Sequence, residues 1–156
     1  MNKENKLIPE LPTGFEDRWN KKLSLKKKLI KVIENNFIKY GFDPLETPSF
    51  EISENIGSFL ANDDANPMSD VFSFNDGDKR ITLRYDLSSP LARFVAQNNQ
   101  ELTLPYKRYA IQNVFRNEKA GNARYREFTQ ADCDIVGNVN PAQANAELCN
   151  LIASTL

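Results

Sequence analysis

Apolar side chains recur at helical spacing in the first long segment of the chain. Between residues 21 and 40 they share one face, at Leu25, Leu29, Val32, Ile33, Phe37 and Tyr40. This spacing predicts a helix over residues 21–40, and Gly41 is typical of the residue that follows a helix C-terminus. Lysines dominate the opposite face. We interpret it as a solvated face, although it could also contact nucleic acid.

Short extended segments follow the helix. Residues 42–47 have the length of a strand, and Pro48 ends that strand because proline cannot donate to an internal ladder. Two further strands are predicted at residues 71–74 and 80–84. The Asp76-Gly77 step between them favours a tight hairpin turn over residues 75–78.

The pattern also predicts further helices. Residues 53–69 combine a short apolar helix candidate with a loop rich in Asn, Asp and Pro. The Ser-Ser-Pro sequence at residues 88–90 is typical of an N-cap followed by proline in the first turn, and this helix should end near residue 98 or 99. Asn140-Pro141 predicts the start of a last helix, which continues to the end of the chain.

The longest extended stretch has two halves, residues 106–118 and 124–136. Small and flexible residues join them at 119–123, which predicts a long antiparallel hairpin with a mobile loop. If Glu118 pairs with Arg124, the two-residue period of a strand places one polar set of side chains on a single face. That set is Arg116, Glu118, Arg124, Arg126, Phe128, Gln130, Asp132 and Asp134.

This polar face has an unusual composition for a solvated strand. It concentrates arginines, which suit bidentate recognition of phosphate or carboxylate. Phe128 lies among them and could stack a base, while Asp132 and Asp134 at the far end could hold an ammonium group. A face that merely meets water is the structural alternative. The sequence has no glycine-rich phosphate loop, so a nucleotide would have to be held by side chains on the sheet.

Composition narrows the chemistry further. The chain has 156 residues, with 20 Lys and Arg against 21 Asp and Glu, and no histidine. The lack of imidazole excludes most catalytic triads and most zinc sites, and we predict no protein metal site. Balanced charge argues against a globally basic nucleic-acid surface. Two cysteines and no signal-like or membrane-spanning stretch favour a soluble, cytoplasmic protein.

Three segments, in this order and spacing, resemble the class II aminoacyl-tRNA synthetases, and among them the histidyl-tRNA synthetase branch. Residues 40–48 resemble the first motif, which forms the dimer interface. Residues 114–118 and 124–128 resemble the two halves of the second motif. Residues 83–93, which include Arg-Tyr-Asp-Leu-Ser, resemble the segment that begins the amino-acid pocket. The resemblance covers nearly the whole chain.

The resemblance implies a fold and a reaction. The expected fold is α+β, an antiparallel sheet flanked by helices that forms an incomplete class II catalytic core. The expected reaction is the activation of histidine by ATP and Mg²⁺ to histidyl-adenylate, followed by transfer to tRNA(His). The expected assembly is a homodimer formed through the helix and strand of the first motif.

The same resemblance implies roles for individual residues. Arg116 would be the catalytic residue, in contact with the α-phosphate of ATP and the carboxylate of histidine. Glu118, Phe128 and Arg124 would contact the adenine amino group, the adenine ring and the outer phosphates. The implied histidine-binding set is Asp86, Ser88, Arg116, Gln130 and Asp134. Asp132 lies on the same face but is equally consistent with a surface charge, so it is not included.

Domain limits follow from both kinds of argument. Pro9, Pro12 and Gly14 with scattered charges predict that residues 1–20 form an irregular lead segment rather than a packed element. The resemblance implies that residues 21–156 are the N-terminal part of the catalytic domain. No segment matches the third motif or the anticodon-binding domain, so we expect a fragment with little or no aminoacylation activity. The alternative is a histidine-sensing regulatory subunit of ATP phosphoribosyltransferase, which shares the fold but does not need the adenine and outer-phosphate contacts.

Overall fold

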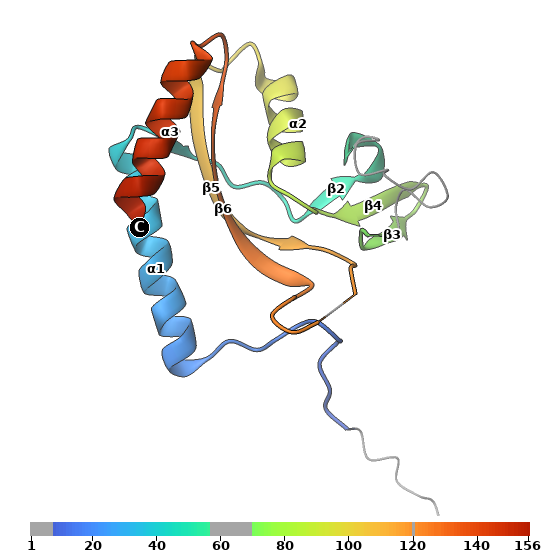
Figure 1. The fold of residues 1–156 in the computed structure, drawn as a ribbon. Coiled ribbons are helices and arrows are strands. Elements are labelled where there is room, and N and C mark those ends of the chain that lie inside the picture. The colour runs from blue at the N-terminus through green and yellow to red at the C-terminus, as the bar shows by residue number, and fades with distance from the viewer. Residues whose placement is uncertain (1–7, 57–69, 120) are drawn as a thin grey trace, which may run out of the picture.

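The computed structural model describes residues 8–56, 70–119 and 121–156. Within them, two three-stranded sheets and three α-helices form an α+β fold, as expected (Figure 1). The helices are α1 (Asn20–Lys39), α2 (Ser88–Asn98) and α3 (Pro141–Thr155). The strands are β1 (Asp43–Pro44), β2 (Phe50–Ile52), β3 (Ser73–Asp76), β4 (Lys79–Leu83), β5 (Tyr106–Phe115) and β6 (Glu127–Val136). None of the described helices is long and apolar enough to cross a membrane.

The long hairpin is formed by β5 and β6, and it has the register that the sequence predicts. Tyr106 lies opposite Val136 and Phe115 lies opposite Glu127, which is the register of the proposed pairing of Glu118 with Arg124. Residues opposite one another share a face in an antiparallel pair. The polar set on β6 therefore shares its face with the even-numbered residues of β5.

Both strands of the hairpin are shorter than predicted at the loop end, because their backbones bond elsewhere. Arg116 N–H still donates to Arg126 O at 2.8 Å. Beyond this pair, Asn117 N–H donates to Asp70 O, also at 2.8 Å, and Arg126 N–H donates to Gly14 O. Neighbouring segments thus take over the bonds that a longer ladder would use.

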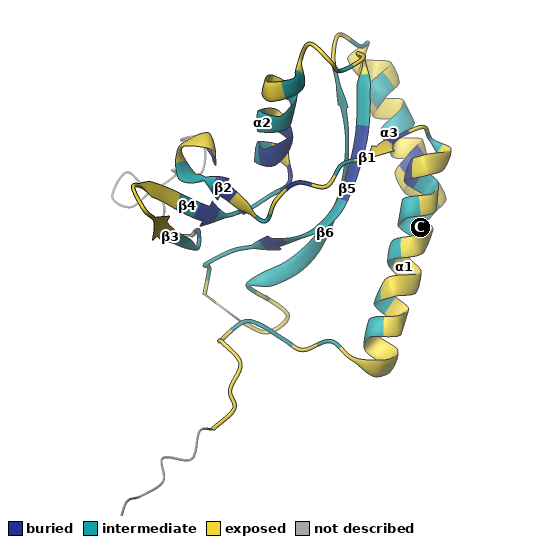
Figure 2. Ribbon diagram, turned by 180° about the vertical axis from the view of Figure 1, so that it is seen from behind, coloured by how far each residue is buried: buried dark blue, intermediate teal, exposed yellow. Residues whose placement is uncertain are grey.

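Helices α1 and α3 cover the apolar face of the hairpin, and α2 lies on the other side (Figures 1 and 2). The buried cluster under α1 and α3 contains Phe37, Phe42, Tyr109 and Leu151. The rings of Phe37 and Tyr109 have centroids 5.3 Å apart. Full burial of a large apolar side chain stabilises the fold by about 1.5–3 kcal/mol, so this cluster fixes the hairpin against the two helices.

The start of α2 differs from the prediction. The residue in the N-cap position is Leu87, which offers no side-chain cap, so the predicted serine cap is wrong. Asp86 supplies the bond instead, since its Oδ1 accepts from Ser89 N–H at 3.0 Å. The predicted cap of α3 is confirmed, because Asn140 Oδ1 accepts from Ala142 N–H at 3.0 Å.

The smaller sheet has the order β2-β4-β3. The predicted hairpin is confirmed, but its turn is shorter than predicted, because Asn75 and Asp76 belong to β3 and Asp76 pairs with Lys79. Gly77 has a φ of +58°, which glycine adopts without strain. Strand β2 was not predicted. A short 3₁₀ helix occupies Ser53–Ile56, and the rest of the ambiguous segment, residues 57–69, lies outside the described residues.

The segment after α1 forms less regular structure than predicted. Only Asp43–Pro44 is a strand, and it runs parallel to β5, so the larger sheet is mixed rather than purely antiparallel. Pro44 has no N–H to donate. Beyond it, Thr47 N–H bonds to the side chain of Gln112 at 3.3 Å instead of to a strand. A proline inside a short edge segment therefore limits the ladder.

Candidate functional site

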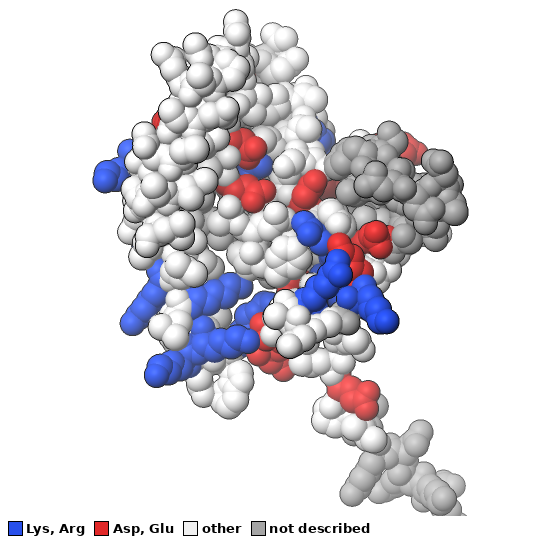
Figure 3. Space-filling model, viewed as in Figure 1, with Lys and Arg blue, Asp and Glu red and all other residues white. Residues whose placement is uncertain are grey.

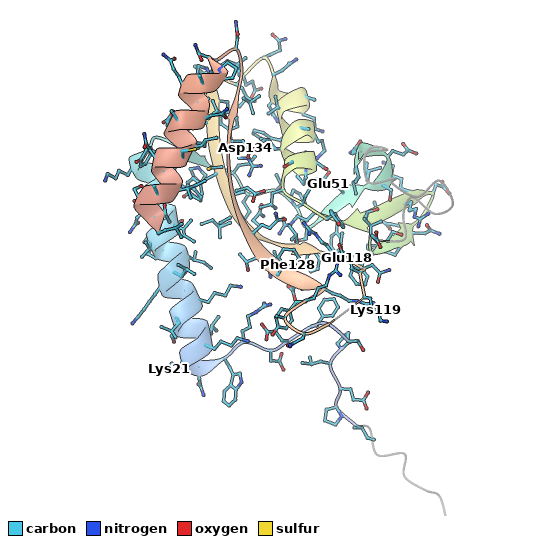
Figure 4. All side chains as sticks on the ribbon, in the orientation of Figure 1. Lys21, Glu51, Glu118, Lys119, Phe128 and Asp134 are labelled. Atoms are coloured by element: carbon cyan, nitrogen blue, oxygen red, sulfur yellow. The ribbon has the colours of Figure 1, made fainter. Side chains whose placement is uncertain are left out.

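The end of the hairpin encloses a cavity of about 370 Å³. Its lining residues are Arg116, Glu118, Ala123, Arg124, Tyr125 and Phe128. The cavity therefore brings together all four side chains of the expected ATP-binding set. Figure 4 shows Glu118 and Phe128 close together at this end of the hairpin, with Asp134 farther along the strand toward α2.

The guanidinium of Arg116 lies between two aromatic rings. Its central carbon is 4.5 Å from the ring centroid of Tyr85 and 5.0 Å from that of Phe128. Each contact places a cation near the negative face of a ring, where it is attracted by roughly 0.5–1 kcal/mol or more. The two rings thus orient the guanidinium of Arg116. Tyr85 was not part of the expected site.

Glu118 connects Tyr85 with Arg124, which lines the cavity. Its Oε1 accepts from the hydroxyl of Tyr85 at 3.1 Å, and its Oε2 forms an ion pair with Arg124. Burial raises the pKa of the Tyr85 hydroxyl above its usual value, and the bond to Glu118 adds to that shift. Tyr85 therefore stays protonated and remains a hydrogen-bond donor to the carboxylate.

An acidic cluster lies farther along the same face of the hairpin. Figure 3 shows acidic side chains in the middle of this face, above a mixed group of acids and bases at the hairpin end. The cluster consists of Asp132, Asp134 and Asp86, and the carboxylate of Asp132 interacts electrostatically with the other two. Burial raises the pKa of Asp132 above its usual value, the two neighbouring carboxylates raise it further, and Arg108 opposes the shift. The cluster is therefore a site of concentrated negative charge.

Arg108 and Asp132 belong to this cluster, and the sequence-based site omitted both. The side chain of Arg108 is fully buried, and its Nη2 lies 2.8 Å from Oδ2 of Asp134. The signal was available, because the predicted register already places Arg108 opposite Asp134 and Asp132 on the polar face. Asp132 was left out because its position in the sequence is equally consistent with a surface charge.

Several buried polar atoms near this cluster have no hydrogen-bond partner among the described residues. They are Ser89 Oγ, Arg108 Nε and Nη1, Gln130 Oε1 and Asp134 Oδ2. The contact of Asp134 with Arg108 joins the two charges without the alignment of a hydrogen bond. Buried polar groups are normally bonded, so this group of unpaired atoms marks the acidic cluster as a candidate functional region. Ser88, from the expected set, is exposed at the start of α2.

The lead segment braces the loop end of the hairpin. It has no regular structure between residues 8 and 19, yet it packs, unlike the expected lead segment. Gly14 O accepts from Arg126 N–H at 2.8 Å, and Arg18 Nη2 donates to Glu127 O at 3.1 Å. The ring of Phe15 meets that of Phe72 at 6.0 Å. The strand that carries Phe128 is thus held from its outer edge.

A family model described as "tRNA synthetases class II core domain (F)" matches residues 13–154. The chain belongs to this family. The matched range contains every residue of the cavity and of the acidic cluster, so both lie within a class II core.

Individual relatives narrow the comparison. The chain is 83% identical to the histidine--tRNA ligase of Pelagibacter ubique over 156 residues, which are 100% of this chain and 34% of that protein. It is 44% identical to the histidine--tRNA ligase of Rhodopseudomonas palustris strain BisB18, over 99% of this chain and 30% of that protein. The chain thus spans about a third of the length of these relatives.

Solved structures share the fold. A histidyl-tRNA synthetase from Nostoc matches with a TM-score of 0.79 and 26% identity, over 96% of this chain and 32% of that one. A Bacillus halodurans protein described as an ATP phosphoribosyltransferase regulatory subunit/histidyl-tRNA synthetase matches with a TM-score of 0.80, also at 26% identity, over 96% of this chain and 38% of that one. Both matches support the expected class II core.

Proposed function

We propose that this chain is the N-terminal part of the catalytic domain of a histidine--tRNA ligase, which activates histidine with ATP and transfers it to tRNA(His). One observation carries the proposal: a single cavity gathers Arg116, Glu118, Arg124 and Phe128, and the acidic cluster continues the same face. Arginines for the phosphates and Phe128 for the base thus lie at one end of the face, and carboxylates for an ammonium group lie farther along it. This is the order that a nucleotide joined to an amino acid requires.

The cavity is the proposed ATP site. Phe128 stacks the adenine ring, since stacking of a base on an aromatic side chain contributes about 1–3 kcal/mol. Glu118 accepts from the adenine amino group, and Arg124 reaches the outer phosphates. Arg116, fixed between Tyr85 and Phe128, contacts the α-phosphate. Its planar guanidinium offers paired donors to phosphate or carboxylate oxygens.

The acidic cluster is the proposed histidine site. Asp86 and Asp134 attract the ammonium group of the amino acid, and the unpaired Oε1 of Gln130 accepts from one of its protons. Ser88, at the start of α2, completes the expected set. The carboxylate of histidine then points along the face toward Arg116, which follows β5 at the loop end and whose N–H donates to Arg126 O.

The proposed chemistry depends on charge and position rather than on a general base. An oxygen of the histidine carboxylate, already anionic, attacks the α-phosphorus, and the bond from that phosphorus to the leaving pyrophosphate breaks. Two anions must therefore be brought together, and Arg116 offsets their repulsion and the charge that develops at phosphorus. A chain without histidine can support this step because the substrate supplies the nucleophile.

Further parts of the proposal concern the metal, the cell compartment and the assembly. We propose that Mg²⁺ enters with the ATP phosphates. Among the described residues, no group of three or more His, Cys, Asp or Glu side chains is placed to hold a metal ion. We expect the reaction to take place in the cytoplasm, and tRNA(His) to be the second substrate. Much of α1 is exposed (Figure 2), and its exposed positions include large apolar residues, which support a homodimer through this helix. They are Leu25, Leu29, Val32 and Ile38.

Histidine-dependent exchange between ATP and pyrophosphate tests the proposal. A full-length protein that contains this chain should catalyse the exchange, and the 156-residue chain alone should show little or none. Arg116→Ala in the full-length protein should abolish the exchange. A full-length protein that binds histidine without any exchange would instead favour the histidine-sensing regulatory subunit. Exchange that is unchanged in Arg116→Ala would contradict the proposed site.

A further inference from the structure

The buried arginine beneath the acidic cluster has no part in the proposed chemistry so far. Arg108 lies near the start of β5 and is fully buried, although long charged side chains are rarely buried unless they are paired. Its Nη2 donates to Leu87 O at 3.0 Å and lies 2.8 Å from Asp134 Oδ2. Its Nε and Nη1 have no hydrogen-bond partner among the described residues. The sheet therefore keeps a cation at a position where an apolar residue would pack without desolvation cost.

The charges around Arg108 explain why a cation is needed there. Those that interact with it come from β6 and from the start of β5. They are Asp132, Cys133 and Asp134, and Tyr106; Asp86 and Arg116 act in turn on Asp132. The carboxylate of Asp132 thus interacts with those of Asp134 and Asp86, and Arg108 is the one buried cation in contact with one of these three among the described residues. Without it, their mutual repulsion would act across a partly desolvated pocket.

Arg108 cannot itself contact a substrate in this conformation, because no part of its side chain is accessible. A role in the site must therefore act through a neighbour. Its two contacts suit such a role: the bond to Leu87 O fixes the backbone just after Asp86, and the ion pair fixes the carboxylate of Asp134. One buried side chain thus connects both walls of the proposed histidine pocket.

We propose that Arg108 is a positioning residue for the amino-acid pocket. It holds Asp134 and the Asp86-Leu87 segment in place and offsets the repulsion among the three carboxylates, so that the pocket can bind the ammonium group of an amino acid. This inference rests on the proposed function and extends it to a residue that does not touch the substrate. It predicts that loss of Arg108 weakens binding of the amino acid and spares the nucleotide.

The test uses a full-length protein that contains this chain and measures KM separately for histidine and for ATP in pyrophosphate exchange. Arg108→Met keeps the length of the side chain and removes the charge. It should raise KM for histidine about tenfold or more and leave KM for ATP within about twofold. Arg108→Lys should give an intermediate value. Arg80→Met, at an exposed arginine that bonds to Ser73 in the smaller sheet, is the control and should change neither KM.

Each other result for the Arg108 variants also decides whether Arg108 positions the pocket. An unchanged KM for histidine in folded Arg108→Met overturns the inference, and so does an equal rise of both KM values, which indicates a general structural role. If Arg108→Met does not fold, the double variant with Asp132→Asn removes one repelling carboxylate and should recover folding and part of the histidine affinity. A double variant that stays unfolded also overturns the inference. If the wild type binds histidine but shows no exchange, the proposed function fails, and calorimetric histidine affinities of the same variants decide the role of Arg108.

Discussion

Glu118 and Arg124 form an ion pair across the mouth of the cavity, between the two side chains that are proposed to contact opposite ends of ATP. The side chain of Arg124 is 64% exposed, so solvent screens the pair and its contribution to stability is at most about 1 kcal/mol. The ligand-free site therefore closes on itself through a contact that costs little to break. Binding of ATP would replace one weak ion pair with two stronger contacts.

Arg124→Ala tests this arrangement. We expect KM for ATP to rise about tenfold, because one charge-assisted contact to phosphate is lost. KM for histidine should stay the same, and the free energy of unfolding should change by less than about 0.5 kcal/mol. Arg80→Ala is a suitable control, because Arg80 is an exposed arginine that bonds only to Ser73 in the smaller sheet among its described contacts. A variant that binds ATP as the wild type does would exclude Arg124 from the site.

The regular elements were predictable because each has a strong local signal. The spacing of apolar residues gave α1 to within one residue, predicted as 21–40 and observed as 20–39. The two-residue period gave the β5–β6 register. The shorter strands were not predictable, because β2 acquires its ladder from β4, and the loop end of the hairpin loses its ladder to Gly14 and Asp70. Such long-range backbone bonds leave no local pattern.

In the site, too, residues with a local sequence pattern were predictable and those brought in by long-range contacts were not. The face with Arg116, Glu118 and Phe128 could be predicted because its members alternate along two strands. Tyr85 could not, because it reaches Glu118 and Arg116 from the segment before α2, which no periodicity relates to the hairpin. The predicted register alone places Arg108 on the polar face. Its burial was not predictable, because in a sequence an arginine on a strand looks like an ordinary surface charge.

Arg84→Met should destabilise the fold strongly. Arg84 is 5% exposed and joins separate segments, since its Nε donates to Asn113 O at 2.6 Å and its Nη1 donates to Thr47 O at 2.7 Å. Its loss removes two buried hydrogen bonds from a charged donor, although Thr47 O keeps its bond from Gln112 Nε2 at 2.9 Å. Each such bond contributes about 1.5–3 kcal/mol, so we expect the free energy of unfolding to fall by about 3 kcal/mol or more. Urea denaturation measures this change.

Two substitutions serve as controls for Arg84. Arg84→Lys should recover only part of the loss, because an ammonium group cannot reproduce the fork of donors that spans the two segments. Arg80→Met, at an exposed position on the neighbouring strand, should change stability by less than about 0.5 kcal/mol. Equal effects of Arg84→Met and Arg80→Met would show that the buried bonds contribute nothing.

The two cysteines should react with a thiol reagent at different rates. Cys149 is exposed, whereas Cys133 is half-buried on the apolar face of β6. Burial raises the pKa of the Cys133 thiol above its usual value, and the neighbouring Asp134 and Asp132 raise it further. The thiolate is the reactive form, so Cys133 should react at least about tenfold more slowly near pH 8 and accelerate as the pH rises. Cys149→Ser should remove the fast phase, and a remaining fast phase would contradict the burial of Cys133.

The pH dependence of the free energy of unfolding should show that the ionised form of Asp132 destabilises the fold. Because the pKa of Asp132 is raised in the folded state, the folded chain binds this proton more tightly than the unfolded chain does. By linkage, the contribution of Asp132 to stability then falls as the pH rises from the ordinary aspartate pKa, about 3.9, through the raised value. Asp132→Asn lacks this ionisation, so it should be more stable than the wild type near pH 7.

The decisive measurement is the difference in unfolding free energy between Asp132→Asn and the wild type across that pH range. It should favour the variant near pH 7 and shrink as the pH falls below about 3.9, where Asp132 is neutral in both states. Asp78→Asn, at an exposed turn position, should show no such trend. A difference that is constant with pH would mean that packing, and not charge, sets the effect. A wild type that is more stable than Asp132→Asn near pH 7 would mean that the attraction of Asp132 to Arg108 exceeds the cost of its burial and of its repulsion by Asp86 and Asp134.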